Sequence, residues 1–202
     1  MEDNRYGIST FEEMLKNEDY SFKKFVVSPT KEVKLKFTYF SNCIFEQIDF
    51  SNIVLENVSF SGCIFNNCIL INKNFLKCAF NKVTFNRGKI FGCEFDESML
   101  KEVIFNNINF RYASFINIQM RNVSFNDSLI QDTSFIKLIN KGINIKSCNF
   151  INVSFSKCDL KDCDFSSSEI QNINIDVSSL KGIIVNSFQA IALSKLLGII
   201  VK

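Results

Sequence analysis

The sequence predicts an all-β protein, folded as a right-handed, four-sided β-helix of about eight coils. When the chain is divided into blocks of five from residue 31, the fifth residue of every block from Leu35 to Val185 is apolar, except Asn140. The third residue of each block is small or β-branched, with Lys73 and Leu138 as the clear misfits. Neither the helical period of 3.6 residues nor the strand period of two produces this pattern.

A large and a small residue two positions apart can both point inward from one short extended side. Four such sides close one coil, so residues 20 apart should stack at a spacing of about 4.8 Å. This stacking predicts two aromatic columns through the core. They comprise Phe45, Phe65, Phe85, Phe105 and Phe125 on one side, and Phe75, Phe95, Phe115, Phe135 and Phe155 on another.

The repeat divides the chain into three parts. Residues 35–185 hold the uninterrupted repeat, so residues 1–34 are predicted to form an N-terminal cap and residues 186–202 a C-terminal cap. Caps are needed because an open end of a β-helix exposes core side chains and unpaired strand edges. Thr10 and Glu13 have capping-box spacing, which predicts a short helix within the N-terminal cap.

The C-terminal cap is predicted to be a helix followed by a short strand. Asn186 or Ser187 can cap a helix over about 188–197, Gly198 can end it, and residues 199–201 are aliphatic. The apolar side chains of this end are expected either to cover the last coil or to form a two-fold dimer interface. The candidate interface residues are Phe188, Ile191, Leu196, Ile199 and Val201.

Eight cysteines invite a metal or disulfide interpretation, but one rule places all of them in the core. Each occupies the small inward position of the repeat, where a buried cysteine acts as a small hydrophobe. The chain has no His, so a zinc site would require cysteines alone. We therefore expect no metal and no cofactor. The cysteines are Cys43, Cys63, Cys68, Cys78, Cys93, Cys148, Cys158 and Cys163.

These features resemble the pentapeptide-repeat family, whose consensus is A(D/N)LXX with Leu or Phe at the centre, over about residues 35–185. The tail Leu197-Gly198-Ile199-Ile200-Val201 further resembles the quinolone-resistance (Qnr-type) branch, whose members end in a helix, a Leu-Gly pair and an aliphatic strand. The resemblance implies a homodimer formed through this end. It also implies a partner, DNA gyrase or topoisomerase IV, bound by mimicry of duplex DNA so that the enzyme is protected from quinolones.

The charge pattern fits a DNA mimic poorly and suggests a second kind of partner. Residues 35–185 contain 15 Lys and Arg against 14 Asp and Glu. Five cations spaced 20 apart are predicted to stack as a basic ladder, either as a solvated face or as a stripe that contacts nucleic acid. The ladder comprises Lys101, Arg121, Lys141, Lys161 and Lys181. A generic interaction scaffold with an unidentified partner is the alternative function.

Other classes of protein find little support. The sequence shows no nucleophile–base pair, no glycine-rich phosphate loop and no cluster with metal-ligand spacing, so we expect no enzyme. No apolar run approaches the roughly 20 residues that cross a bilayer, and no signal peptide is visible, which favours the cytoplasm. The Asn-, Ile-, Lys- and Phe-rich composition suggests a bacterial source. Because the phase never slips, any projecting loop must be a multiple of five residues, and 137–142 is the candidate.

Overall fold

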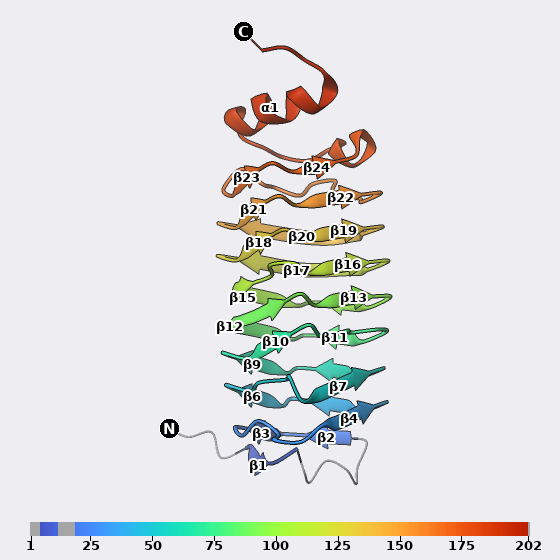
Figure 1. Cartoon of the computed structure of the whole chain (residues 1–202), viewed down its shortest axis with the longest axis vertical. Coiled ribbons are helices and arrows are strands. Elements are labelled where there is room, and N and C mark those ends of the chain that lie inside the picture. Colours follow the sequence, from blue (N-terminus) through green and yellow to red (C-terminus); the bar gives the residue numbers. More distant parts are fainter. Residues whose placement is uncertain (1–4, 12–18, 202) are drawn as a thin grey trace.

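The chain winds into a stack of coils whose strands run parallel to their neighbours. The computed structural model describes residues 5–11 and 19–201. Figure 1 shows the coils one above another, with the first strands at one end and the helix α1 (Ser187–Ser194) at the other. Partners in adjacent coils are 20 residues apart, as in the pairs Phe45–Phe65 and Phe85–Phe105. The predicted β-helix of about eight coils is confirmed.

The strands lie on four faces, numbered 1 to 4 in the order in which the chain visits them. Face 1 holds β2 (Asp19–Ser21), β5 (Tyr39–Ser41), β8 (Ser59–Ser61), β11 (Ala79–Asn81), β14 (Met99–Lys101) and the first residues of β17 (Gln119–Asn126) and β20 (Ile139–Lys146). Face 2 holds β3 (Lys23–Phe25), β6 (Ile44–Glu46), β9 (Ile64–Asn66), the first residues of β12 (Thr84–Phe91) and β15 (Ile104–Asn109), and the last residues of β17 and β20.

Faces 3 and 4 complete each coil. Face 3 holds β10 (Ile69–Ile71), β18 (Leu129–Gln131), β21 (Asn149–Ile151), β23 (Glu169–Gln171) and the ends of β12 and β15. Face 4 holds β4 (Val33–Lys36), β7 (Ile53–Glu56), β13 (Glu94–Asp96), β16 (Ser114–Ile116), β19 (Ser134–Ile136), β22 (Ser154–Ser156) and β24 (Asn174–Ile175). The alternation of buried and outward residues on each short side leaves one interior and four solvent-facing surfaces.

Both predicted aromatic columns run through the interior. On face 2, the rings from Phe45 to Phe125 stack with centroids 4.5–5.1 Å apart. On face 4, the rings from Phe75 to Phe155 stack at 4.6–5.1 Å. Stacked parallel strands impose this spacing on the rings, and full burial of each ring contributes about 1.5–3 kcal/mol.

The corners of the coils are built from residues with left-handed backbone conformation. Positive φ recurs at positions whose numbers end in 2 or 7, and 24 of the described residues there are not glycine. Half of those 24 are Asn or Asp, whose short polar side chains tolerate this conformation best among residues with a Cβ. A chain with seven glycines and one proline can therefore still turn a corner every five residues.

The three misfits of the repeat have local explanations. Lys73 keeps its ammonium outside and donates from Nζ to the backbone oxygens of Ser51 (2.8 Å) and Ile53 (3.2 Å). Leu138 is buried at the small position, while Asn140 is only partly buried at the large one. The two residues have exchanged roles, so the coil keeps an apolar side chain inside. No loop projects at the candidate site, because 139–146 form the strand β20.

The stacking begins before residue 35, within the predicted N-terminal cap. Strands β2 and β3 pair with β5 and β6 in the 20-residue register. The strand β1 (Gly7–Ser9) pairs with β3 at a shorter spacing, with Ser9 opposite Phe25. Phe11 is buried against Phe25, with ring centroids 5.0 Å apart. The short helix predicted from Thr10 and Glu13 falls largely on 12–18, outside the described residues.

The C-terminal helix forms as predicted, but the strand after it does not. Asn186 accepts a hydrogen bond from the N–H of Gln189, whose side chain accepts one from the N–H of Asn186, a complete capping box. A 3-10 helix (Val177–Leu180) precedes α1, another (Lys195–Leu197) follows it, and Gly198 ends the helix with φ 74°. Residues 199–201 have no neighbouring strand and take no strand conformation.

Candidate interaction surfaces

The basic ladder lies along one edge of face 1. Register places Lys101 opposite Arg121 in β14 and β17, and Arg121 opposite Lys141 in β17 and β20. Lys161 and Lys181 occupy the same place in the turns of the next two coils. Lys101 is partly buried and the other four are exposed. The structure thus brings the first three together in register and continues the row with the last two.

Few carboxylates neutralise the ladder. Lys101 Nζ lies 3.9 Å from Glu102 Oε1, and no ion pair within the described chain involves any of the other four cations. Asp159 and Asp162 lie near one end, where they share a surface hollow of about 280 Å³ with Lys141 and Lys161. Within the described chain, Arg121 and Lys181 therefore have neither an ion pair nor a place in this hollow.

The C-terminal cap presents a second candidate surface, which is apolar. On α1, Gln189 and Leu193 face the last coil, and Gln189 Nε2 donates to the backbone oxygens of Phe165 (2.9 Å) and Ser168 (2.7 Å). The five residues predicted for a dimer interface instead face outward. Their exposed fractions are 82% for Phe188, 47% for Ile191, 45% for Leu196, 52% for Ile199 and 50% for Val201. All five therefore stay at least 45% exposed in the single chain, although Leu196 also lines a hollow with Ile170 and Ile173 of the last coil.

The cysteines take the structural positions predicted for them. All eight are buried with free thiols. Burial raises the pKa of Cys68 and Cys163 to about 12 and the pKa of Cys78 and Cys93 to about 11. A thiol with a raised pKa is a poor nucleophile and a poor metal ligand. The described residues contain no group of three or more Cys, Asp or Glu that could hold a metal ion.

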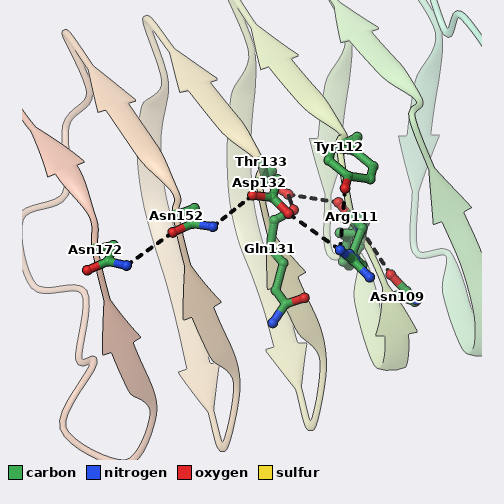
Figure 2. Close-up of polar contacts among 9 residues, drawn as sticks. Asn109, Arg111, Tyr112, Gln131, Asp132, Thr133, Asn152 and Asn172 are labelled. Carbon is green, nitrogen blue, oxygen red and sulfur yellow. Dashed lines mark hydrogen bonds and ion pairs between the residues drawn. The ribbon is translucent and has the colours of Figure 1, made fainter.

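A polar row at the corner between faces 3 and 4 was not predicted from the sequence. Figure 2 shows Asn172, Asn152 and Asp132 in line, each one coil from the next. Asn172 Nδ2 donates to Asn152 Oδ1 (3.4 Å), and Asn152 Nδ2 donates to Asp132 Oδ1 (2.9 Å). Arg111 Nη2 lies 3.7 Å from Asp132 Oδ2. The 20-residue rule applied to outward positions would have found this row.

An exposed aromatic group adjoins the polar row. The Arg111 guanidinium lies 5.3 Å from the centroid of the Tyr112 ring, and its Nη2 donates to Tyr112 Oη at 3.3 Å. Phe91 meets Tyr112 edge-on, with centroids 5.2 Å apart. Arginine and aromatic residues are enriched at protein–protein contacts. This group could not be predicted from the sequence, because the residues at its positions differ in type from coil to coil.

Face 2 carries a longer amide row. Asn126, Asn106 and Asn86 each donate from Nδ2 to the Oδ1 of the asparagine one coil earlier, at 2.9–3.0 Å. The row ends where Asn66 Nδ2 donates to Glu46 Oε2 (3.0 Å). Asn106, Asn86 and Asn66 each donate and accept, so the row ties five coils into register and ends on the carboxylate of Glu46.

A groove of about 530 Å³ crosses the corner between faces 2 and 3. Gly88 lines it, and a Cβ at this residue would lie 2.7 Å from the backbone oxygen of Cys68. Arg87 and Lys89, which flank Gly88 in the sequence, also line the groove, and both are exposed. Asp127 also lines the groove. These cations are an isolated pair and do not continue into a column.

Taken together, the five-residue repeat, the parallel coils and the outward side-chain columns define a pentapeptide-repeat β-solenoid. A family model described as pentapeptide repeat region matches residues 58–135, and one described as pentapeptide repeats matches 34–71 and 143–182. The chain belongs to the pentapeptide-repeat family. No curated protein sequence shows significant similarity to the chain.

Solved structures with similar coils include proteins of different roles. Full-length QnrB1, a plasmid-mediated fluoroquinolone resistance protein, is 17% identical over 96% of this chain and 100% of its own, with a TM-score of 0.34. Rfr23 from the cyanobacterium Cyanothece 51142 is 11% identical over 63% of this chain and 91% of its own, with a TM-score of 0.37. HetL from Nostoc sp. PCC 7120, involved in heterocyst differentiation, is 10% identical over 84% of this chain and 83% of its own, with a TM-score of 0.31.

Within the described ranges, none of the helices combines the length and the apolar character needed to cross a membrane.

Proposed function

We propose that this protein is a non-catalytic binding rod that dimerises through its C-terminal cap and binds a type II topoisomerase, DNA gyrase or topoisomerase IV, so as to protect it from quinolones. The observation that supports this most is the exposed apolar surface of the cap. Phe188 is 82% exposed and Ile200 is 86% exposed, at an end where five further apolar residues are also exposed. These are Ile191, Leu196, Leu197, Ile199 and Val201. Isolated exposed apolar residues are ordinary, but a contiguous group marks an interaction surface.

A two-fold dimer is the arrangement that covers this surface most simply. The cap is the end of a rod, so a second copy can meet it end to end and bury the same residues on both chains. The order of helix, Leu197-Gly198 and aliphatic residues resembles the Qnr-type pattern, although residues 199–201 do not form its strand in the single chain. The dimer would be a rod of twice the length, with flat faces available to a large partner.

Recognition of a topoisomerase would rest on shape more than on charge. The repeat carries 15 cations and 14 anions, so the rod does not reproduce the uniform negative charge of a DNA duplex. Acidic side chains do gather on face 4 and its corner, at Glu94, Asp96 and Glu97. Face 4 is therefore the side on which contact with a DNA-binding groove is most favourable.

The dimer is tested by measuring the mass in solution. Light scattering should give twice 23.2 kDa for the native chain. The double variant Phe188→Asp/Ile200→Asp should give the monomer mass, because it places charges in the apolar interface. The matched control is Ile8→Asp at the opposite end, where Ile8 is 75% exposed, and it should remain dimeric. A native mass of 23.2 kDa at high concentration would reject the dimer.

The topoisomerase is tested by a supercoiling assay. The protein is titrated into gyrase that is inhibited with ciprofloxacin and, in parallel, into gyrase without ciprofloxacin. Restored supercoiling, reduced in the Phe188→Asp/Ile200→Asp variant, is the expected result. Unchanged inhibition at every concentration of a folded, dimeric protein would reject topoisomerase protection and leave the dimer standing.

A further inference from the structure

The cations of the basic ladder lie in one column of face 1, each one coil from the next. Three of its cations, Lys101, Arg121 and Lys141, are direct partners in the parallel register of face 1. Lys161 and Lys181 extend the same column by two further coils. Four spacings of one coil each give the ladder a length of roughly 19 Å.

The fold does not require these charges. In the earlier coils the same column holds Ser41, Ser61 and Asn81, which are neutral and stack equally well. Like charges placed directly opposite each other on adjacent strands destabilise a sheet. Arg121 and Lys141 are exposed, and neither forms an ion pair within the described chain. Because these stacked charges destabilise the sheet and Arg121 and Lys141 form no ion pair within the described chain, we expect an anion from outside the molecule to bind them.

We propose that the basic ladder of face 1 binds the phosphodiester backbone of a nucleic acid strand laid along the axis of the rod. A single phosphate or carboxylate would need one or two cations, whereas a row of five matches a ligand that repeats its charge along a line. In duplex DNA each strand presents a phosphate every 3.4 Å or so along the axis, and long flexible Lys and Arg side chains can follow that repeat. Contacts of this kind set affinity without reading sequence.

The carboxylates beside the ladder determine where along it a phosphate should bind most tightly. Asp159 and Asp162 share the hollow that Lys141 and Lys161 line, so they oppose a bound phosphate there. Lys101 is paired with Glu102, whereas Arg121 has neither an ion pair within the described chain nor a place in this hollow, so binding should centre on Arg121 and its neighbours in the ladder. Removal of the two aspartates should extend the usable row toward Lys161.

The experiment measures binding of a fluorescent 20-mer, single-stranded or as a duplex of the same sequence, between 50 and 200 mM salt. With four to five contacts, the plot of log K against log salt should have a slope of about −3 for the single strand, a loss of roughly 60-fold over this range. The variant Arg121→Gln/Lys141→Gln should bind more weakly and lower the slope by about 1.4. The variant Asp159→Asn/Asp162→Asn should bind more tightly.

The matched control removes the same two charges elsewhere. Arg87→Gln/Lys89→Gln changes the corner groove between faces 2 and 3 and should leave the affinity and slope close to those of the native chain. Melting curves verify folding, and Arg121→Gln/Lys141→Gln should melt no lower than the native protein because it relieves repulsion. The proposal is overturned by absence of binding at 50 mM salt, by equal losses in the ladder and control variants, or by tighter binding of heparin than of either oligonucleotide. No topoisomerase is present, so the result is independent of the function proposed above.

Discussion

The aromatic coils and the coil that contains Asn140 solve the same packing problem in different ways. From Phe45 to Phe125 the large inward position of face 2 is always Phe. One coil later this position is Ile145, and on face 1 the large position is Asn140. Asn140 Oδ1 accepts hydrogen bonds from the N–H groups of Gly142 and Ile143, both at 2.9 Å, so its side chain serves the turn.

The comparison shows what the repeat demands of its sequence. Leu138 supplies the apolar volume that Asn140 withholds, and it is 3% exposed. Leu138 does not fill the space completely, because an apolar cavity of about 20 Å³ remains among Leu138, Ile145 and their neighbours. Each side of a coil therefore needs an adequate apolar volume facing inward, and the identity of the position that supplies it matters less.

Alkaline titration should give the largest effect, because thiols lie in both regions. Cys68, Cys78 and Cys93 belong to the aromatic coils and Cys163 packs beside Asn140, with pKa values raised to about 11 or 12. Each raised pKa contributes stability that is complete below the ordinary thiol value near 8.5 and is lost as pH rises toward 11–12. Over this range each thiol lowers the free energy of unfolding by about 1.4 kcal/mol per pH unit, so the protein should unfold between the ordinary thiol pKa and pH 11–12.

Circular dichroism against pH measures the unfolding midpoint. Cys93→Ala should move that midpoint to higher pH, and Ala113 already occupies the equivalent position one coil later without difficulty. If the protein were as stable at pH 11 as at pH 8, the assignment of these thiols to a dry core would be contradicted.

The second effect is the loss of one ring from an aromatic column. Phe105→Ala should lower the free energy of unfolding by about 3–5 kcal/mol, because Phe105 is fully buried between Phe85 and Phe125 and its removal leaves a cavity. Urea denaturation measures the change. Ile104→Ala on the outward side of the same strand is the control and should cost less than about 1 kcal/mol. Similar losses in the two variants would be inconsistent with the column.

The exchange of roles in the Asn140 coil can be tested directly. Leu138→Ala should cost about 2–4 kcal/mol, as for other buried leucines. Asn140→Ala should cost only about 1 kcal/mol, the value of hydrogen bonds lost in a partly exposed turn. If Asn140→Ala proved the more damaging of the two, Leu138 would not be the residue that fills this side of the core.

The smallest expected effect is a gain. Ile145→Phe should raise stability by about 1 kcal/mol, because the ring continues the column above Phe125 and fills the cavity beside Leu138. Ile139→Phe on the exposed side of β20 is the control and should leave the melting temperature unchanged. A lower melting temperature for Ile145→Phe would show that the space is too narrow for a ring.

The interior could be predicted from the sequence, and the surface only in part. Inward positions are fixed by a rule within each block of five, so the aromatic columns and the cysteines follow from the sequence alone. The amide row of Asn66–Asn126 depends on outward residues one coil apart, and the contact of Arg111 with Tyr112 depends on how two adjacent outward side chains are oriented. The rule for inward positions predicts neither.

The two ends were harder to predict than the middle. The expected strand at 199–201 has no partner among the described strands, and a strand requires one. Tyr20 and Phe25 follow the repeat although their preceding small positions do not, and the coil register accepts them because Phe40 and Phe45 stack on their rings.

The stacking register gives the core and the surface different tolerances to changes in length. An insertion of five residues keeps every apolar side chain facing inward but rotates all later coils by a quarter turn, so that Lys141 no longer follows Arg121. A duplication of 20 residues lengthens the rod by one coil, about 4.8 Å, and leaves each outward column continuous. Relatives that differ by single quarter turns can therefore share an interior while presenting entirely different binding faces.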